Sequence, residues 1–315
     1  MLRLASLTAA LVLTAIATVG PAASQDQKPA APQSQAPNAA PAAKAPLSRE
    51  EELQQALAAA YKVAKVGPAD VKLGTQGRIS LPAGYQYIPI LEAARLMRAF
   101  GNRTGDTFLG LVLSTVDADG WISIIDFKKA GYVKDDDAKD WKADELLQSL
   151  KDGTDEANSD RRDRGFPELE VAGWVEKPAY DAATHRLVWS VLARTKGQPL
   201  GGNDSVNYNT YALGREGYYQ LNLITGSQRI DADKRHAKAL LAALAYEQGQ
   251  RYEDFNPSTD KVAEYGLAAL VAGAVAKKLG LLAAAGVFLL KFAKIIAVAV
   301  AGIGVLAGKL FRRKG

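Results

Sequence analysis

Residues 206–224 read VNYNTYALGREGYYQLNLI, and this stretch decides the fold class. Two runs rich in aromatic and aliphatic residues flank the tetrapeptide GREG at 214–217, whose glycines suit a tight turn. In the second run Tyr219, Leu221 and Leu223 alternate with polar residues, which is the period of a strand with one dry face. The stretch therefore predicts an antiparallel β-hairpin.

The same pattern occurs twice earlier in the chain. The expected strand pairs are 109–116 with 121–127 around the turn 117–120, 169–175 with 186–192 around the turn 178–181, and 206–213 with 218–224 around the turn 214–217. A short strand is expected at 78–81, and helices at 48–62, 89–100, 143–164 and 231–247. Hairpins rather than helical crossovers join the strands, so the sequence predicts an α+β fold with an antiparallel sheet and flanking helices.

The N-terminal 46 residues are not expected to join this domain. Arg3, the apolar run 4–19 and the small residues at 20–23 predict a secretory signal peptide over 1–23, with an uncleaved signal anchor as the alternative. Residues 24–46 consist almost wholly of Ala, Pro, Gln, Ser and Asn, a composition typical of a disordered linker. Either reading of the signal places the domain at 47–260 outside the cytoplasm.

The C-terminal segment predicts a membrane anchor. An Ala/Gly-rich helix is expected over 261–286, a transmembrane helix over 287–308, and a basic cytoplasmic tail over 309–315. Together with the signal, this arrangement predicts a single-pass protein of the bacterial inner membrane. Its main domain would lie in the periplasm and its C-terminus in the cytoplasm.

Two lysines and a row of small residues stand out in this segment. Lys291 and Lys294 share a helix face and either snorkel to the outer headgroups or face a partner helix, an acidic group or a wet cavity. A seam of small residues permits close helix approach and a possible homo-oligomer. The seam consists of Gly266, Ala269, Gly273, Ala276, Gly280 and Ala283.

Composition excludes several classes of function. The chain has no cysteine, which excludes thiol catalysis, thiolate metal sites, disulfides and a lipid-modified cysteine. Its formal net charge is +5, but nine of the 39 basic residues lie in the signal or in and beside the C-terminal apolar region. The other 30 stand against 34 acidic residues, a net charge of −4. A nucleic-acid partner is not expected, because binding phosphates requires a basic face.

Six sequence blocks together resemble an uncharacterised bacterial family, known as domain of unknown function 2167. The blocks are residues 81–85, 131–138, 178–181, 207–210, 213–217 and 254–261. The resemblance covers about residues 50–310 and implies secretion and membrane anchoring, because the members are described as membrane-anchored. It implies no activity, so no functional residue is carried over from the family.

Two acidic clusters are candidate sites. The run 135–137 is either a carboxylate site for a hard cation or a solvated loop that caps a helix. The oxygens of 254–260 imitate the start of a calcium loop but lack its glycine and its final Glu, and a turn before a helix explains them equally. The candidate binding residues are Asp135, Asp136, Tyr180, Asp181, Asn207, Tyr208, Arg215, Glu216, Asp254, Asn256 and Asp260.

No metal, cofactor or catalytic residue is predicted. His185 and His236 would form a metal site only if folding brought them together. Otherwise His185 lies at the start of a strand and His236 on the surface of a helix. No nucleophile or phosphate-loop motif occurs. The sequence favours a non-catalytic module that binds an envelope protein, lipid or wall partner. Two alternatives stay open: a carboxylate-dependent hydrolase of wall glycan or peptide, and an oligomeric membrane component that uses Lys291 and Lys294.

Overall fold

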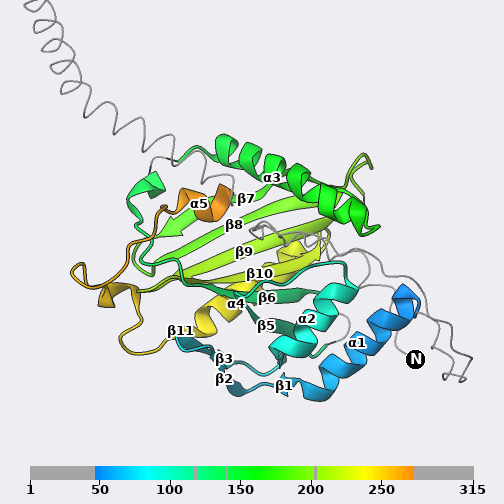
Figure 1. Cartoon of the computed structure of the whole chain (residues 1–315), viewed down its shortest axis with the longest axis horizontal. Coiled ribbons are helices and arrows are strands. Elements are labelled where there is room, and N and C mark those ends of the chain that lie inside the picture. The colour runs from blue at the N-terminus through cyan, green and yellow to red at the C-terminus, as the bar shows by residue number, and fades with distance from the viewer. Residues whose placement is uncertain (1–46, 117–119, 140, 202–203, 273–315) are drawn as a thin grey trace, which may run out of the picture.

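The computed structural model describes residues 47–116, 120–139, 141–201 and 204–272 (Figure 1). The strands are β1 (Lys65–Val66), β2 (Ala69–Leu73), β3 (Gly77–Leu81), β4 (Tyr85–Ile88), β5 (Phe108–Ser114), β6 (Ile122–Lys128), β7 (Leu169–Asp181), β8 (Arg186–Thr195), β9 (Ser205–Leu213), β10 (Tyr218–Gly226) and β11 (Leu244–Tyr246). The helices are α1 (Arg49–Val63), α2 (Ile90–Ala99), α3 (Ala143–Asp163), α4 (Ile230–Ala243) and α5 (Ala268–Ala272).

The strands form two antiparallel sheets. The large sheet has the order β1-β4-β5-β6-β10-β9-β8-β7, and the small sheet has the order β11-β3-β2. The β9–β10 hairpin has the predicted register, with Tyr218 opposite Leu213 and the turn closed by the Gly214 N–H, which donates to the Gly217 carbonyl at 2.8 Å. The predicted α+β class with antiparallel strands and flanking helices is confirmed.

Both faces of the large sheet are covered, which positions the core in two layers. On one face α4 and the small sheet pack against Tyr219, Leu221 and Leu223 of β10. On the other face α1 and α2 cover β4 to β6, while α3 and α5 cover β7 to β9 (Figure 1). The alternation seen in the sequence of β10 therefore separates two buried faces.

The start of α1 follows the sequence signal. Ser48 Oγ accepts a hydrogen bond from the Glu51 backbone N–H at 3.2 Å, and the Glu51 carboxylate accepts one from the Ser48 N–H at 2.9 Å. This reciprocal capping box satisfies two N–H groups that the first helical turn leaves without partners.

Two expected boundaries of secondary structure are wrong. The second hairpin turns at residues 182–185 rather than 178–181, because Pro178 lies in the edge strand β7, where a missing N–H is tolerated. The helix expected over 231–247 ends at Ala243, because Leu244 pairs with Ile79 and completes the small sheet. Tertiary pairing thus overrides the helical propensity of this alanine-rich segment.

The C-terminal boundary of the domain also lies further on than expected. Residues 261–267 are not helical, because Val262 bridges to Tyr132 and the Ala263 N–H donates to the Tyr132 carbonyl at 2.8 Å. Leu267 and Leu270 are buried in the cluster under α3. The domain predicted to end at 260 therefore continues through Ala272.

Among the residues that the structure describes, no helix has the length and apolar character needed to cross a bilayer. The predicted signal 1–23, linker 24–46, span 287–308 with Lys291 and Lys294, and tail 309–315 lie outside the described residues. Most of the small-residue seam, from Gly273 onward, lies outside them as well. These assignments stay predictions.

The two edges of the large sheet are irregular. At one edge β1 contributes two residues, followed shortly by Pro68. At the other edge β7 is long, but its pairing with β8 shifts register at Val171/Gly173, Trp174/Glu176 and Glu176/Ala179. Each shift bends the strand locally.

Candidate functional site

Four of the sequence blocks meet at one end of the large sheet, at the left of Figure 1. The blocks are residues 131–138, 178–181, 213–217 and 254–261. The Gly131 N–H donates to the Glu216 carbonyl at 2.9 Å, and the Tyr132 N–H donates to the Lys261 carbonyl at 2.8 Å. Segments far apart in the sequence are thus held together by backbone hydrogen bonds.

At this end Tyr180 connects a carboxylate to an imidazole. Its hydroxyl oxygen lies 2.8 Å from Oδ2 of Asp135 and 3.1 Å from Nδ1 of His185. The phenol has one proton, so when it donates to Asp135 its oxygen accepts from the Nδ1–H of His185. The network therefore assigns the proton of neutral His185 to Nδ1 and leaves a lone pair on Nε2. We call these three residues the Asp135 centre.

The environment keeps the Tyr180 phenol protonated. Burial, and then the hydrogen bond to the Asp135 carboxylate, raise the pKa of Tyr180 far above its usual range. The side chains of His185 and Asp135 remain 27% and 28% exposed. The Asp135 centre is therefore ordered by its own hydrogen bonds and still open to solvent.

A column of four stacked rings fixes the plane of the imidazole. Phe255 stacks on Tyr132 with ring centroids 3.9 Å apart, Tyr132 on Tyr252 at 4.3 Å, and Tyr252 on His185 at 4.0 Å. The Tyr252 hydroxyl donates to the Val133 carbonyl at 2.9 Å, which anchors the middle of the column. Each ring pair contributes about 0.5–1.5 kcal/mol beyond its buried area.

His185 has an uncommon backbone conformation. Its φ of +53° makes it the one non-glycine residue with positive φ within the described ranges. Its carbonyl accepts a hydrogen bond from the Leu213 N–H at 3.0 Å, which ties the β7–β8 turn to β9. Such a conformation costs about 1–3 kcal/mol and recurs at functional sites.

An ion pair between Arg215 and Asp260 joins the GREG turn to the segment 249–260. The Arg215 guanidinium donates from Nε and Nη2 to the two carboxylate oxygens of Asp260, at 2.6 and 2.8 Å, and from Nη1 to the Gly249 carbonyl at 3.1 Å. The sequence makes Arg215 a candidate binding residue at the hairpin tip. The structure instead uses it to hold residues 249–260 against the turn.

This ion pair predicts an acid-sensitive contribution to stability. The Arg215 guanidinium, and then the Asn256 backbone N–H, hold the pKa of Asp260 well below its usual range. An unfolded Asp titrates at about 3.9, so the contribution is fully present above that pH and is lost as the pH falls toward the folded pKa. Asp260→Asn should therefore be destabilised at neutral pH, and the difference from wild type should shrink below about pH 4.

Urea unfolding between neutral pH and about pH 2.5 would measure this difference. Asp136→Asn, which removes an exposed carboxylate at the same end, is the matched control and should follow the wild-type curve. A difference between Asp260→Asn and wild type that stays constant across the range would contradict the assignment.

The three aspartates of the run 135–137 make different contacts. Asp135 belongs to the Asp135 centre, and Asp136 is exposed. Asp137 accepts hydrogen bonds from the N–H groups of Leu267 and Ala268, at 3.0 and 3.1 Å. The run therefore ties the segment that enters α5 to the loop carrying Asp135.

The remaining predicted residues at this end make local contacts. Asp181 accepts from Ala183 N and Thr184 Oγ1, Asp254 from Arg251 N, and Asn256 from Ser258 N, while Glu216 pairs with Lys129 and Gln76. Within the described ranges no three His, Asp or Glu side chains gather closely enough to hold a metal ion.

Asn207 and Tyr208 are not brought to this end. Both lie in the middle of β9, where Asn207 is 2% exposed and Tyr208 is fully buried. These two candidate binding residues are not accessible at the surface, because helices and the small sheet cover both faces of β9. Asn207 Oδ1 accepts instead from the side-chain amide of Asn222 at 3.2 Å.

Sequence reasoning missed the roles of His185, Tyr132 and Tyr252. The fold does not unite the two histidines, because His236 lies on α4, 3.0 Å from the Tyr85 hydroxyl. The available signal was the short spacing of Tyr180 and His185, which a hairpin turn at 182–185 brings close together at the end of the hairpin. Placing the turn at 178–181 hid that signal.

Comparison with known proteins gives a family but no activity. The profile of the family described as "Protein of unknown function (DUF2167)" matches residues 65–304. No curated protein matches the chain. The solution structure of PsbP (CyanoP) from the cyanobacterium Synechocystis sp. PCC 6803 is similar at 8% identity and a TM-score of 0.35, covering 58% of this chain and 91% of that one.

A second solved structure, the Ran-binding protein Mog1p from Saccharomyces cerevisiae, is similar at 11% identity and a TM-score of 0.29. The match covers 57% of this chain and 96% of that one. Neither likeness is close enough to bear on function.

Proposed function

The chain belongs to the DUF2167 family of proteins of unknown function, and on that premise we propose that it is a membrane-anchored periplasmic module that binds a component of the cell envelope. Its recognition surface is the end of the domain that carries the Asp135 centre and the four-ring column. The partner is an envelope protein, a lipid or a wall component.

One observation carries this proposal. Asp135 comes from a loop, Tyr180 from the end of β7 and His185 from the β7–β8 turn, and the three form one hydrogen-bonded chain that is still partly open to water. A polar group fixed in this way loses little conformational freedom on binding, which favours recognition. The positive φ of His185 also shows that the fold tolerates local strain there.

The position of the surface agrees with an anchored module. Asp137, two residues from Asp135, binds the backbone of Leu267 and Ala268. These residues enter α5, the last described element before the predicted membrane segment. The proposed surface is thus the part of the domain most closely tied to the predicted anchor.

Site-specific photo-crosslinking in living cells tests the proposal. A photoreactive residue at the exposed Asp136 should give a discrete adduct, whereas one at Leu91, which is 74% exposed on α2, should not. Tyr180→Phe should lower the Asp136 adduct about tenfold, because it leaves Asp135 and the His185 Nδ1–H without their shared partner. Identical adducts from both probes, or an adduct unchanged in a folded Tyr180→Phe protein, would refute the proposed surface.

A hydrolase is the second candidate, and the assigned tautomer of His185 favours it. An Nε2 lone pair on an imidazole held by Tyr180 is suited to accept a proton from water. Arg215 is held by Asp260 and Gly249, so this candidate does not rely on it. Purified wall polymer incubated with the protein should then release soluble fragments, and His185→Gln should abolish the release; intact polymer with wild-type protein would dismiss this candidate.

A further inference from the structure

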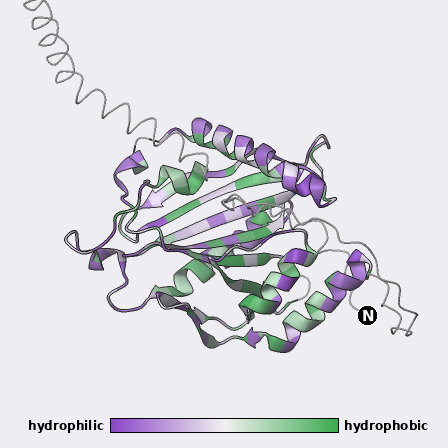
Figure 2. Ribbon diagram, in the orientation of Figure 1, coloured by the Kyte–Doolittle hydropathy of each residue, from purple (hydrophilic) through white to green (hydrophobic). Residues whose placement is uncertain are grey.

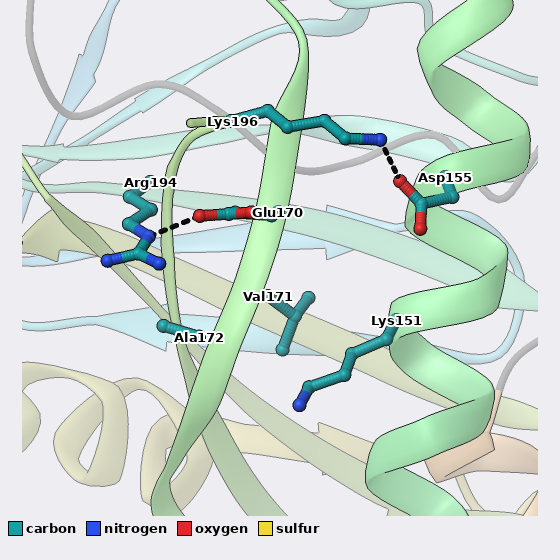
Figure 3. Close-up of a pocket in the computed structure, with 7 residues that line it drawn as sticks. All are labelled: Lys151, Asp155, Glu170, Val171, Ala172, Arg194 and Lys196. Atoms are coloured by element: carbon teal, nitrogen blue, oxygen red, sulfur yellow. Dashed lines mark hydrogen bonds and ion pairs between the residues drawn. The ribbon is translucent and has the colours of Figure 1, made fainter. Parts of the chain in front are cut away.

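A hollow of about 270 Å³ opens between α3 and the paired strands β7 and β8 (Figure 3). Its charged lining residues are Lys151, Asp155, Glu170, Arg194 and Lys196. Ala172 lines it eight strand positions before Tyr180, roughly 25 Å away at the rise of an extended strand. The hollow is therefore separate from the Asp135 centre.

The sheet irregularity described above provides the space. The register of β7 against β8 shifts between Val171 and Gly173, so Ala172 has no paired residue opposite it. Its side chain is a single methyl group, and the neighbouring charged side chains surround the gap. The hollow therefore lies at the bulge of β7 and results from the course of its backbone.

The carboxylates of the lining are already used. Asp155 accepts from the Lys196 ammonium at 2.6 Å, and Glu168 also lies 3.7 Å from that ammonium. Glu170 accepts from Nε of Arg194 (Figure 3). These contacts fix the positions of two cationic side chains, those of Lys196 and Arg194.

Two cationic side chains at the hollow keep donors that no described residue uses. The terminal nitrogens of Arg194 make no hydrogen bond with any described residue, and the Lys151 ammonium makes neither a hydrogen bond nor an ion pair with one. A guanidinium fixed through Nε still presents its terminal nitrogens, which bind an oxyanion through two parallel hydrogen bonds. The Lys151 ammonium, which lines the same hollow, adds a second positive charge.

We propose that this hollow is a binding site for a small oxyanion of the phosphate type, held by Arg194 and Lys151. Its volume lies just below the range of pockets for drug-sized ligands, which suits a phosphate group rather than a long chain. Lys196, neutralised by Asp155 and Glu168, shapes the rim. The phosphate group belongs either to a free anion or to a lipid headgroup.

Thermal unfolding of the full chain in detergent tests the site. Inorganic phosphate, titrated at constant ionic strength, should raise the unfolding midpoint of wild type, as expected for a ligand bound only by the folded state. Lys151→Gln and Arg194→Lys should each weaken the fitted phosphate affinity about tenfold. Arg194→Lys keeps the charge and the pairing with Glu170 but removes the planar fork.

The control variant is Lys177→Gln, which removes an exposed charge from the same strand outside the hollow and should keep the wild-type response. A second arm replaces free phosphate by phosphatidic acid in the micelles, with phosphatidylcholine as reference. Stabilisation by phosphatidic acid alone identifies a lipid headgroup, and stabilisation by free phosphate identifies a soluble anion. Equal responses in all variants, or none with either probe, would overturn the proposal.

Discussion

Gly217→Ala is expected to lower the free energy of unfolding by about 3 kcal/mol or more. A Cβ at this position would lie 1.9 Å from the Lys128 carbonyl oxygen and 3.1 Å from the Ala130 nitrogen. Both are backbone atoms, and Lys128 is paired with Tyr218 of β10, so neither can rotate away as a side chain would. The main chain has to move, and the GREG turn that Arg215 and Asp260 brace would move with it.

Thermal or urea unfolding of the domain measures the effect. For a domain of this size a loss of about 3 kcal/mol corresponds to a fall in the midpoint of roughly 6–12 °C. Gly173→Ala is the matched control, because a Cβ there meets no atom within 4 Å and the backbone is not in the left-handed region. A Gly217→Ala protein as stable as Gly173→Ala would show that β6 and the turn are not packed as described.

Asp233→Ala is expected to be the second largest change, with a loss of about 2–4 kcal/mol. The Asp233 carboxylate, 1% exposed, accepts from the Thr225 hydroxyl and from Nε and Nη2 of Arg229. Arg229 is partly exposed and can turn to water. Thr225 is fully buried, so its hydroxyl would lose its acceptor in a site that water does not reach.

The same helix supplies the control. Asp231 lies in the first turn of α4, is 92% exposed at its side chain and pairs with Lys234 at 2.8 Å. Asp231→Ala should leave the urea midpoint nearly unchanged, because exposed pairs contribute little. Equal losses in the two variants would indicate that both act through the start of the helix rather than through burial.

The hairpins could be predicted from the sequence because each is local. In β10 the alternation of Tyr219, Leu221 and Leu223 is visible within a few residues, and the turn glycines delimit it. The strand β11 could not be predicted in the same way, because residues 244–246 continue an alanine-rich helical pattern. Only their pairing with β3, more than 160 positions earlier, makes them a strand.

The candidate site was predicted as a set of residues without its connections. The sequence indicates both Asp135 and Tyr180 as candidates, yet the hydrogen bond between them joins positions 45 apart and leaves no mark in the sequence. The ring column leaves no mark in the sequence either, because Phe255, Tyr132 and His185 come from three separate segments. The pairing of Arg215 with Asp260 likewise depends on how residues 249–260 fold back.

The irregular margins of the large sheet bear on how copies of the protein behave when they share a surface. Tethering, as proposed, would confine them to two dimensions, where collisions between neighbours are frequent. An exposed edge strand would then pair through its free backbone groups with the edge strand of a neighbouring molecule. A two-residue β1 and a β7 bent by bulges offer no straight template for such growth, so high surface density should not drive these domains into sheet-to-sheet aggregates.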